Sequence, residues 1–200
     1  MANKTTKENY KTFHPKTRQA WRKWLEKNHS ISPGIWLIYD KKSTGRAKLV
    51  YNDAVEEALC FGWIDSTMRP LDGERFMQRF TPRKPKSGWS GLNKKRIEKM
   101  IAEGLMASAG LEKIDLAKKD GSWESLDYID AIRLPEDFEK ALSKNKKARV
   151  NFENFPPFSK KQFLYHINQA KTEVTRKQRI RLCVKMAAAN KKPSVGGFKL

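Results

Sequence analysis

The sequence predicts an α+β protein, in which a small and mainly antiparallel sheet with flanking helices is followed by a helical C-terminal unit. Three observations predict this fold class. Strand-forming runs rich in β-branched and aromatic residues occur in the first half of the chain, two of them form a clear hairpin, and amphipathic helical patterns surround them and fill the remainder. The chain has 200 residues with 38% hydrophobic, including six Trp and ten Phe, so it can bury a sizeable core.

The first predicted helix lies in FHPKTRQAWRKWLEKNH, with Pro15 at a first helical position. Apolar residues and Asn28 recur there at helical spacing: Trp21, Trp24, Leu25 and Asn28. GIWLIYDKK then predicts a strand and STGR a turn. LVYNDAVEEALCFG predicts a second helix, with Asn52 or Asp53 as its cap and Gly62 as its left-handed exit.

A hairpin is predicted in WIDSTMRPLDGERFMQRF, two runs of strand formers joined through PLDG. Alternation with period two assigns the first run to two faces. We expect Trp63, Asp65, Thr67 and Arg69 on one face, and Ile64, Ser66 and Met68 on the other. Asp65 therefore shares its face with Trp63.

The segment TPRKPKSGWSGLN has two prolines and two glycines without periodicity, which predicts a loop. Helices then resume in NKKRIEKMIAEG, capped by Asn93 or Ser90, and in MASAGLEKIDLAKKDG. Their predicted inward residues are Ile97, Met100, Ile101, Leu111, Ile114 and Leu116. SWESLDYIDAIRL lacks strong periodicity and is the predicted boundary between the two units.

Beyond the boundary, helices are predicted from PEDFEKALSKN onward, with Ser159 and Gln162 forming a capping box before KKQFLYHINQAK. The last long helix is expected to bury Ile180, Cys183, Val184 and Ala187. The predicted organisation is a flexible N-terminus over 1–12, an α+β unit over 13–124, a basic helical unit over 135–190 and a flexible tail over 191–200.

Positive charge is concentrated in the C-terminal third. The formal net charge is +20, and residues 140–200 hold 16 Lys and Arg against the two acids Glu153 and Glu173. Such a field attracts nucleic acid or an anionic membrane surface, although solubility alone also explains it. The last helix carries a basic face that could lie along phosphates or be merely solvated: Arg176, Lys177, Arg179, Arg181 and Lys185.

Several classes of protein are disfavoured. No run of about 18 apolar residues occurs, and no apolar segment follows the basic N-terminus, so we expect a cytoplasmic protein. Cys60 and Cys183 lie in apolar helical patterns and are expected to be buried, reduced thiols. Cys60 lies near a helix C-terminus, where the macrodipole raises a thiol pKa, which favours a core thiol over a nucleophile. Two Cys and three scattered His offer no metal pair, and no cofactor is expected.

Asp65 is the candidate for a functional carboxylate. Beside Trp63 it must reach solvent or find a partner, for which Arg69, Arg79 and Arg83 are candidates. The pair would either pin the following loop or form the polar corner of a ligand pocket. The loop supplies donors suited to an anionic or carbonyl-bearing group: Arg83, Lys84, Ser87, Trp89, Ser90 and Asn93.

Motifs spread over residues 13 to 190 carry a family resemblance. ALCFGWID, FTPRKPKSGWSGLN, GLMASAGL and AKKDGSW together resemble the YdeI/OmpD-associated family of bacteriocin-protection proteins. FPPFSKKQFLYHINQAKTEVTRKQRIRLC is similar to that family's C-terminal segment, with Ala170, Lys171, Thr175 and Arg176 in its characteristic elements. The resemblance implies a cytoplasmic or envelope-associated stress protein linked to tolerance of antimicrobial peptides or bacteriocins. It implies no established chemistry and no catalytic residues.

A strongly basic chain is physically unsuited to capture a cationic peptide directly, so protection would act through an anionic partner, nucleic acid or envelope component. The sequence thus predicts a non-enzymatic stress-tolerance protein with an anion or partner site at the GWID hairpin and the PRKPKSGWS loop. Two alternatives stay open. One is nonspecific nucleic-acid binding by the last helix, and the other is an enzyme that uses Asp65 as acid or base.

Overall fold

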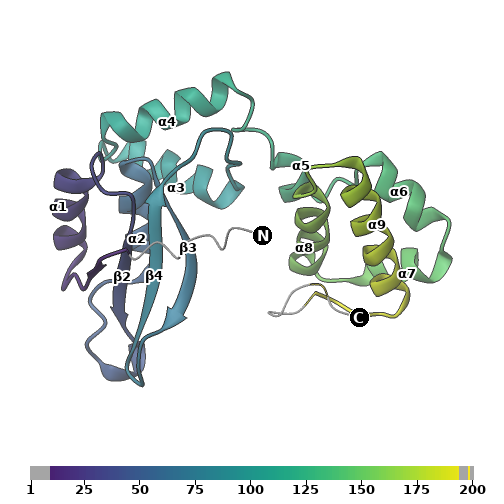
Figure 1. Cartoon of the computed structure of the whole chain (residues 1–200), viewed down its shortest axis with the longest axis horizontal. Helices are drawn as coiled ribbons and strands as arrows, with labels where there is room; N and C mark the ends of the chain where they lie inside the picture. Colours follow the sequence, from purple (N-terminus) through teal and green to yellow (C-terminus); the bar gives the residue numbers. More distant parts are fainter. Residues whose placement is uncertain (1–9, 194–197, 199–200) are drawn as a thin grey trace, which may run out of the picture. The chain divides into compact units, whose positions relative to one another are not determined.

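The computed structural model describes residues 10–193 and 198, and it confirms the predicted α+β fold class. The chain divides into two compact units between Ser125 and Leu126 (Figure 1). Most of the predicted flexible ends, residues 1–9, 194–197 and 199–200, fall outside the described part. None of the helices within that part is long and apolar enough to cross a membrane.

The first unit contains a four-stranded sheet and its flanking helices. Its elements are β1 (Thr12–Phe13), α1 (Arg18–Asn28), β2 (Ile35–Asp40), the 3-10 helix η1 (Lys42–Thr44), α2 (Tyr51–Cys60), β3 (Trp63–Pro70), β4 (Arg75–Pro82), α3 (Gly91–Ala102) and α4 (Ser108–Lys119). The strand order is β1-β2-β4-β3. β1 is parallel to β2, and the other two pairings are antiparallel, as expected for a mainly antiparallel sheet.

One extra residue in β3 changes which side chains share a face. Asp65 lies opposite Phe80, whereas Met68 lies opposite Gln78, so three steps on β3 match two on β4. This is a β-bulge, and beyond it the alternation is inverted. Met68 therefore shares the face of Asp65, and Arg69 lies on the opposite one. The prediction that Arg69 shares a face with Asp65 was wrong for this reason.

One face of the sheet packs on α2, which also contacts α1, α3 and α4 (Figure 1). Aromatic side chains fill much of this core. The Trp21 ring stacks on Trp24, with 5.2 Å between the ring centroids, and packs edge-to-face with Phe80, with 5.5 Å between the centroids. The Trp21 indole also donates a hydrogen bond to the Ala54 carbonyl of α2 at 3.0 Å. Helix α1 is thereby tied to both the sheet and α2.

Buried charges link the same helices. Glu57 of α2 is 3% exposed and accepts hydrogen bonds from Arg18 at 2.6 Å and from Arg22 at 2.8 Å. Glu56, 2% exposed, is paired with Arg18 at 3.0 Å and with Lys99 of α3 at 3.0 Å. Because each carboxylate has two cationic partners, burial of the charges is compensated.

Two helix starts differ from the predicted ones. Helix α1 begins at Arg18 with Thr17 as its N-cap, because the Thr17 hydroxyl accepts a hydrogen bond from the Ala20 amide, so Pro15 precedes the helix. Helix α2 begins at Tyr51 after Val50, which places Asn52 and Asp53 inside the first turn. There the negative charge of Asp53 interacts favourably with the positive end of the helix dipole, but Asp53 is not the N-cap.

Helix α4 buries a narrower face than the sequence predicts. Ile114 is buried as expected, but Leu111 and Leu116 are 42% and 54% exposed. The buried positions are Gly110, Ile114 and Ala117. A Cβ on Gly110 would lie 2.2 Å from the Cys60 carbonyl oxygen, so only glycine allows this approach of α4 to α2. In α3, Ile97 and Met100 are buried and Ile101 is 51% exposed, against the prediction.

The second unit is helical. Its elements are α5 (Asp127–Asp130), α6 (Glu136–Ser143), α7 (Lys146–Asn154), α8 (Pro157–Asn168) and α9 (Glu173–Ala188). In the core of this unit, the Phe152 ring packs edge-to-face with Phe138 and Phe163, with 5.4 Å and 5.7 Å between the ring centroids. Pro157 starts α8, so Ser159 lies inside the helix and forms no capping box. In α9 Ile180, Cys183 and Ala187 are buried as predicted, but Met186 is buried where Val184 was expected.

Candidate functional site

The two segments of the predicted site meet through their backbones. The Arg83 amide donates a hydrogen bond to the Gly62 carbonyl at 2.9 Å, and Trp63 lies opposite Pro82 in the β3–β4 ladder. The start of the hairpin and the proline-bearing loop are therefore neighbours. Their functional side chains, however, do not converge.

The two predicted indoles serve different parts of the core. Trp63 is 1% exposed, and its indole N–H donates a hydrogen bond to the His29 carbonyl at 3.1 Å. Its ring packs edge-to-face with Trp24, with 5.7 Å between the ring centroids. Trp89 is 2% exposed and packs against Trp123, with 5.1 Å between the ring centroids. Both rings contribute to packing.

Asp65 is half-buried, and its partners are neutral. Its carboxylate accepts hydrogen bonds from the Tyr51 hydroxyl at 3.0 Å and from the Gln78 amide at 2.7 Å. The expectation of an arginine partner was wrong. Arg69 lies over the Trp36 ring at 5.0 Å on the other face, and Arg79 donates to Ser66 at 2.9 Å.

The loop donors are largely used within the loop. Arg83 is 4% exposed, lies 3.5 Å from the Trp89 ring centroid and donates to the Gly88 carbonyl at 2.7 Å. Ser90 caps α3, the Ser87 hydroxyl donates to the Lys84 carbonyl, and Asn93 accepts from Arg96. Lys84 is exposed. The cavity beside this loop measures about 20 Å³, which is room for one water molecule.

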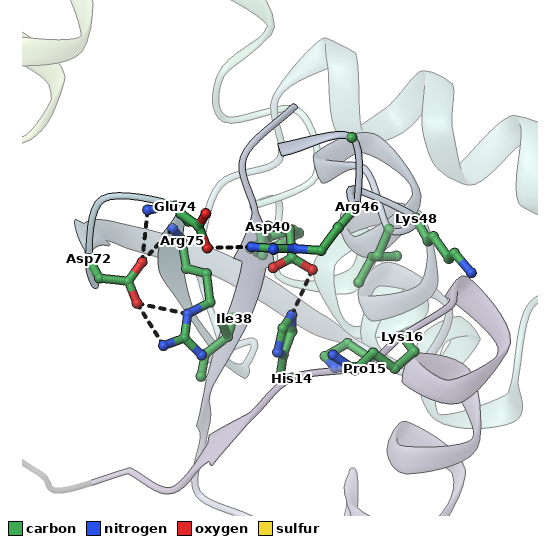
Figure 2. Close-up of a pocket in the computed structure, with 13 residues that line it drawn as sticks. His14, Pro15, Lys16, Ile38, Asp40, Arg46, Lys48, Asp72, Glu74 and Arg75 are labelled. Atoms are coloured by element: carbon green, nitrogen blue, oxygen red, sulfur yellow. Dashed lines mark hydrogen bonds and ion pairs between the residues drawn. The ribbon is translucent and has the colours of Figure 1, made fainter. Parts of the chain in front are cut away.

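A larger pocket of about 600 Å³ lies at the outer edge of β2. β1 covers that edge only at Trp36 and Leu37, because the chain leaves the sheet after Phe13. Figure 2 shows what surrounds the exposed end of β2. We call this the β2-edge pocket, and its lining residues are His14, Pro15, Lys16, Ile38, Tyr39, Asp40, Gly45, Arg46, Lys48, Leu49, Asp72, Glu74 and Arg75.

Each carboxylate of the β2-edge pocket already has a basic partner. Asp40 accepts a hydrogen bond from His14 Nε2 at 3.1 Å. Glu74 is paired with Arg46. Asp72 is paired with Arg75 at 2.6 Å, and this hydrogen bond holds the pKa of Asp72 below its usual value.

Two lysines of the pocket are left over. Lys16 and Lys48 are exposed, and no carboxylate of the described residues lies within 4 Å of either ammonium group. Figure 2 shows both on the side of the pocket away from the Asp72–Arg75 pair. The pocket thus combines three carboxylates that already have a hydrogen-bond or ion-pair partner with two available cations, an arrangement that suits a small anion.

Sequence reasoning missed this pocket because no motif contains it. His14 and Lys16 come from the β1–α1 connection, Asp40 from β2, and Lys48 from the segment before α2. The parallel β1–β2 pairing brings the β1–α1 connection beside β2, where His14 reaches Asp40. The sequence contains the run HPK at this place, but the shortness of β1 that leaves the edge of β2 open is visible only in the structure.

Most of the remaining candidates are inert or engaged; Arg181 and Lys185 of α9 are exposed. Burial, aided by Glu57, raises the pKa of Cys60 to about 11, and burial raises that of Cys183 to about 12. Within residues 10–193 and 198, no three His, Cys, Asp or Glu side chains form a group that could hold a metal ion. On α9, Arg176 is paired with Asp137 and Lys177 with Glu173, while Arg179 donates to the His166 carbonyl.

Comparison with known families divides the chain as the structure does. Residues 13–113 match the model described as a domain of unknown function, DUF8412. Residues 131–190 match the model described as bacteriocin-protection, YdeI or OmpD-associated. No curated protein and no solved structure matches the chain.

Proposed function

Because the chain belongs to the DUF8412 family over its first half and carries a YdeI/OmpD-associated domain behind it, we propose that it is a stress-tolerance protein of the bacteriocin-protection type that binds a small anion. The binding site is the β2-edge pocket of the first unit. Its role is recognition of the anion, not chemistry on it.

The observation that carries this proposal is the imbalance between partnered and available charge. Three carboxylates of the pocket are each held by His14, Arg46 or Arg75, so they do not compete for Lys16 and Lys48. An anion entering the pocket meets two free ammonium groups without breaking an ion pair. Each charge-assisted contact to such a ligand contributes about 1.5 kcal/mol or more.

The loop expected from the sequence is less well suited to a metabolite. The Arg83 guanidinium already stacks on Trp89 and donates a hydrogen bond to the Gly88 carbonyl. The adjoining cavity has room for about one water molecule. A ligand there would have to displace packed groups. The β2-edge pocket requires no such rearrangement.

Calorimetric and NMR titration of the full chain with inorganic phosphate, pyrophosphate and citrate tests the proposal. We expect saturable binding of at least one anion, with amide shifts around Lys16 and Lys48. Lys16→Gln and Lys48→Gln should each weaken it by about tenfold, the equivalent of one charge-assisted contact. Lys23→Gln, at an exposed position of α1 outside the pocket, is the matched control.

Absence of saturable binding for all three anions would remove the β2-edge pocket as an anion site. If Lys23→Gln weakened anion binding as much as the pocket variants do, the anion would be attracted by the net charge of the protein alone. The stress role has its own test, survival under a cationic antimicrobial peptide with the gene present and deleted. If survival depends on the gene and Lys16→Gln/Lys48→Gln restores it fully, the pocket is not what protects.

A further inference from the structure

The basic residues of α9 fall into two groups. In the first half of the helix each charge has an internal partner. Arg176 binds Asp137 through two hydrogen bonds, Lys177 is paired with Glu173 at 2.6 Å, and Arg179 donates to the His166 carbonyl at 2.6 Å. Carboxylates thus neutralise Arg176 and Lys177, and a backbone carbonyl holds Arg179, before any external partner arrives.

Past Ile180 the pattern changes. Arg181 and Lys185 lie one turn apart on α9, and Lys144 follows the end of α6; all three are exposed. No carboxylate in the described part of the chain lies within 4 Å of these three cations. The available charge of the helix is therefore concentrated at its C-terminal half.

These three cations border a groove of about 400 Å³ between α6 and α9. Its floor is apolar and is built largely from one stripe of α9, in which Ile180, Val184 and Ala188 recur every four residues. Ala141 of α6 and Asn145 complete the lining. The groove contains no acidic residue. We call it the α6–α9 groove.

We propose that the α6–α9 groove binds an acidic amphipathic helix of a partner protein. The stripe of modest side chains lets a second helix approach closely and bury its own apolar face, which is the usual helix-in-groove mode. Acidic residues at the edges of that helix would then meet Lys144, Arg181 and Lys185. The charge selects an acidic partner, and the apolar floor selects a helix over a bare polyanion.

Nucleic acid fits the groove less well. A phosphate backbone gains from closely spaced cations and gains nothing from an apolar floor, and three of the five basic residues of α9 are already engaged inside the protein. The site lies in the second unit and does not depend on the anion pocket of the first.

The test is fluorescence anisotropy of the full chain with a labelled synthetic helix that carries leucines on one face and glutamates along both edges. We expect saturable binding that Lys185→Glu weakens by about tenfold, since it places like charges opposite each other. Val184→Ser should weaken binding by about threefold through the loss of apolar contact. Lys171→Glu makes the same change of charge at an exposed position outside the groove and should have less than a twofold effect.

Three outcomes would overturn the proposal. The first is no binding of the peptide at low salt. The second is an equal loss with Lys171→Glu, which would indicate a diffuse field. The third is an oligonucleotide of equal charge that competes as well as the peptide while Val184→Ser changes nothing, which would identify a phosphate-binding surface. Circular dichroism of each variant separates loss of binding from loss of folding.

Discussion

Arg83 stacks on Trp89, with its guanidinium carbon 3.5 Å from the ring centroid, and both side chains are buried. A loop arginine that resembles a ligand donor in the sequence is thus part of the packing that holds the loop. Its charge is offset by the ring and by the carbonyls of the same loop, of which Gly88 is the closest at 2.7 Å.

Arg83→Ala should therefore destabilise the first unit. We expect the free energy of unfolding to fall by about 2–4 kcal/mol, from the lost cation–π contact and the charged hydrogen bond. Arg83→Lys should recover only part of this, because an ammonium group cannot stack as a planar guanidinium does. Urea unfolding followed by tryptophan fluorescence measures both variants. The neighbouring exposed Lys84→Ala should stay within about 0.5 kcal/mol of the parent, and an equal loss there would contradict the assignment.

Gly110→Ala should also destabilise, although alanine is normally the better helix former. The added Cβ would lie 2.2 Å from the Cys60 carbonyl oxygen, and a backbone atom cannot move aside cheaply. Overpacking of this kind costs about 1–3 kcal/mol, which exceeds the helix-propensity gain of about 1 kcal/mol. Thermal unfolding measures the sign. Gly73→Ala, where no atom lies within 4 Å, is the control and should be close to neutral.

The second unit should lose stability in acid through Asp137. Hydrogen bonds from Arg176 hold the pKa of this carboxyl below its ordinary value of 3.8. The lower folded pKa means that the contribution is complete above about pH 4 and disappears as the pH falls through the folded value. Asp137→Asn should thus lower stability at pH 6 and have a smaller effect near pH 2. Urea unfolding at both pH values tests this; a mutational effect equal at the two would rule out the ionic origin.

Both thiols should be unreactive in the folded protein. With a pKa of about 11 for Cys60 and about 12 for Cys183, at most about one thiol in a thousand is ionised at pH 8. Both side chains are also buried. Ellman's reagent should react slowly with the native chain and rapidly with both cysteines in denaturant. The single variants Cys60→Ala and Cys183→Ala assign the two reactions, and a fast phase in native buffer would show an accessible thiol.

The fold class followed from periodicity, because Ile35–Asp40 and the two hairpin runs are rich in strand formers and most other periodic segments are helical. The directions of Trp63 and Trp89 did not follow, since neighbouring backbones do not determine which part of the core each ring enters. The partners of Asp65 were equally hidden: Tyr51 lies on α2 and Gln78 on β4. The narrow buried face of α4 depends on Gly110 meeting Cys60, a contact that no helical pattern records.

The bulge in β3 decides how the hairpin responds to a change in its length. Because the strand contains one residue more than its partner between Asp65 and Met68, losing one residue there would restore regular pairing and leave Met68 opposite Gln78. Arg69 would also stay on the face that holds Trp36. A one-residue deletion between Asp65 and Met68 should therefore be tolerated better than the same deletion in a regularly paired part of β3, where the side chains beyond it would change face.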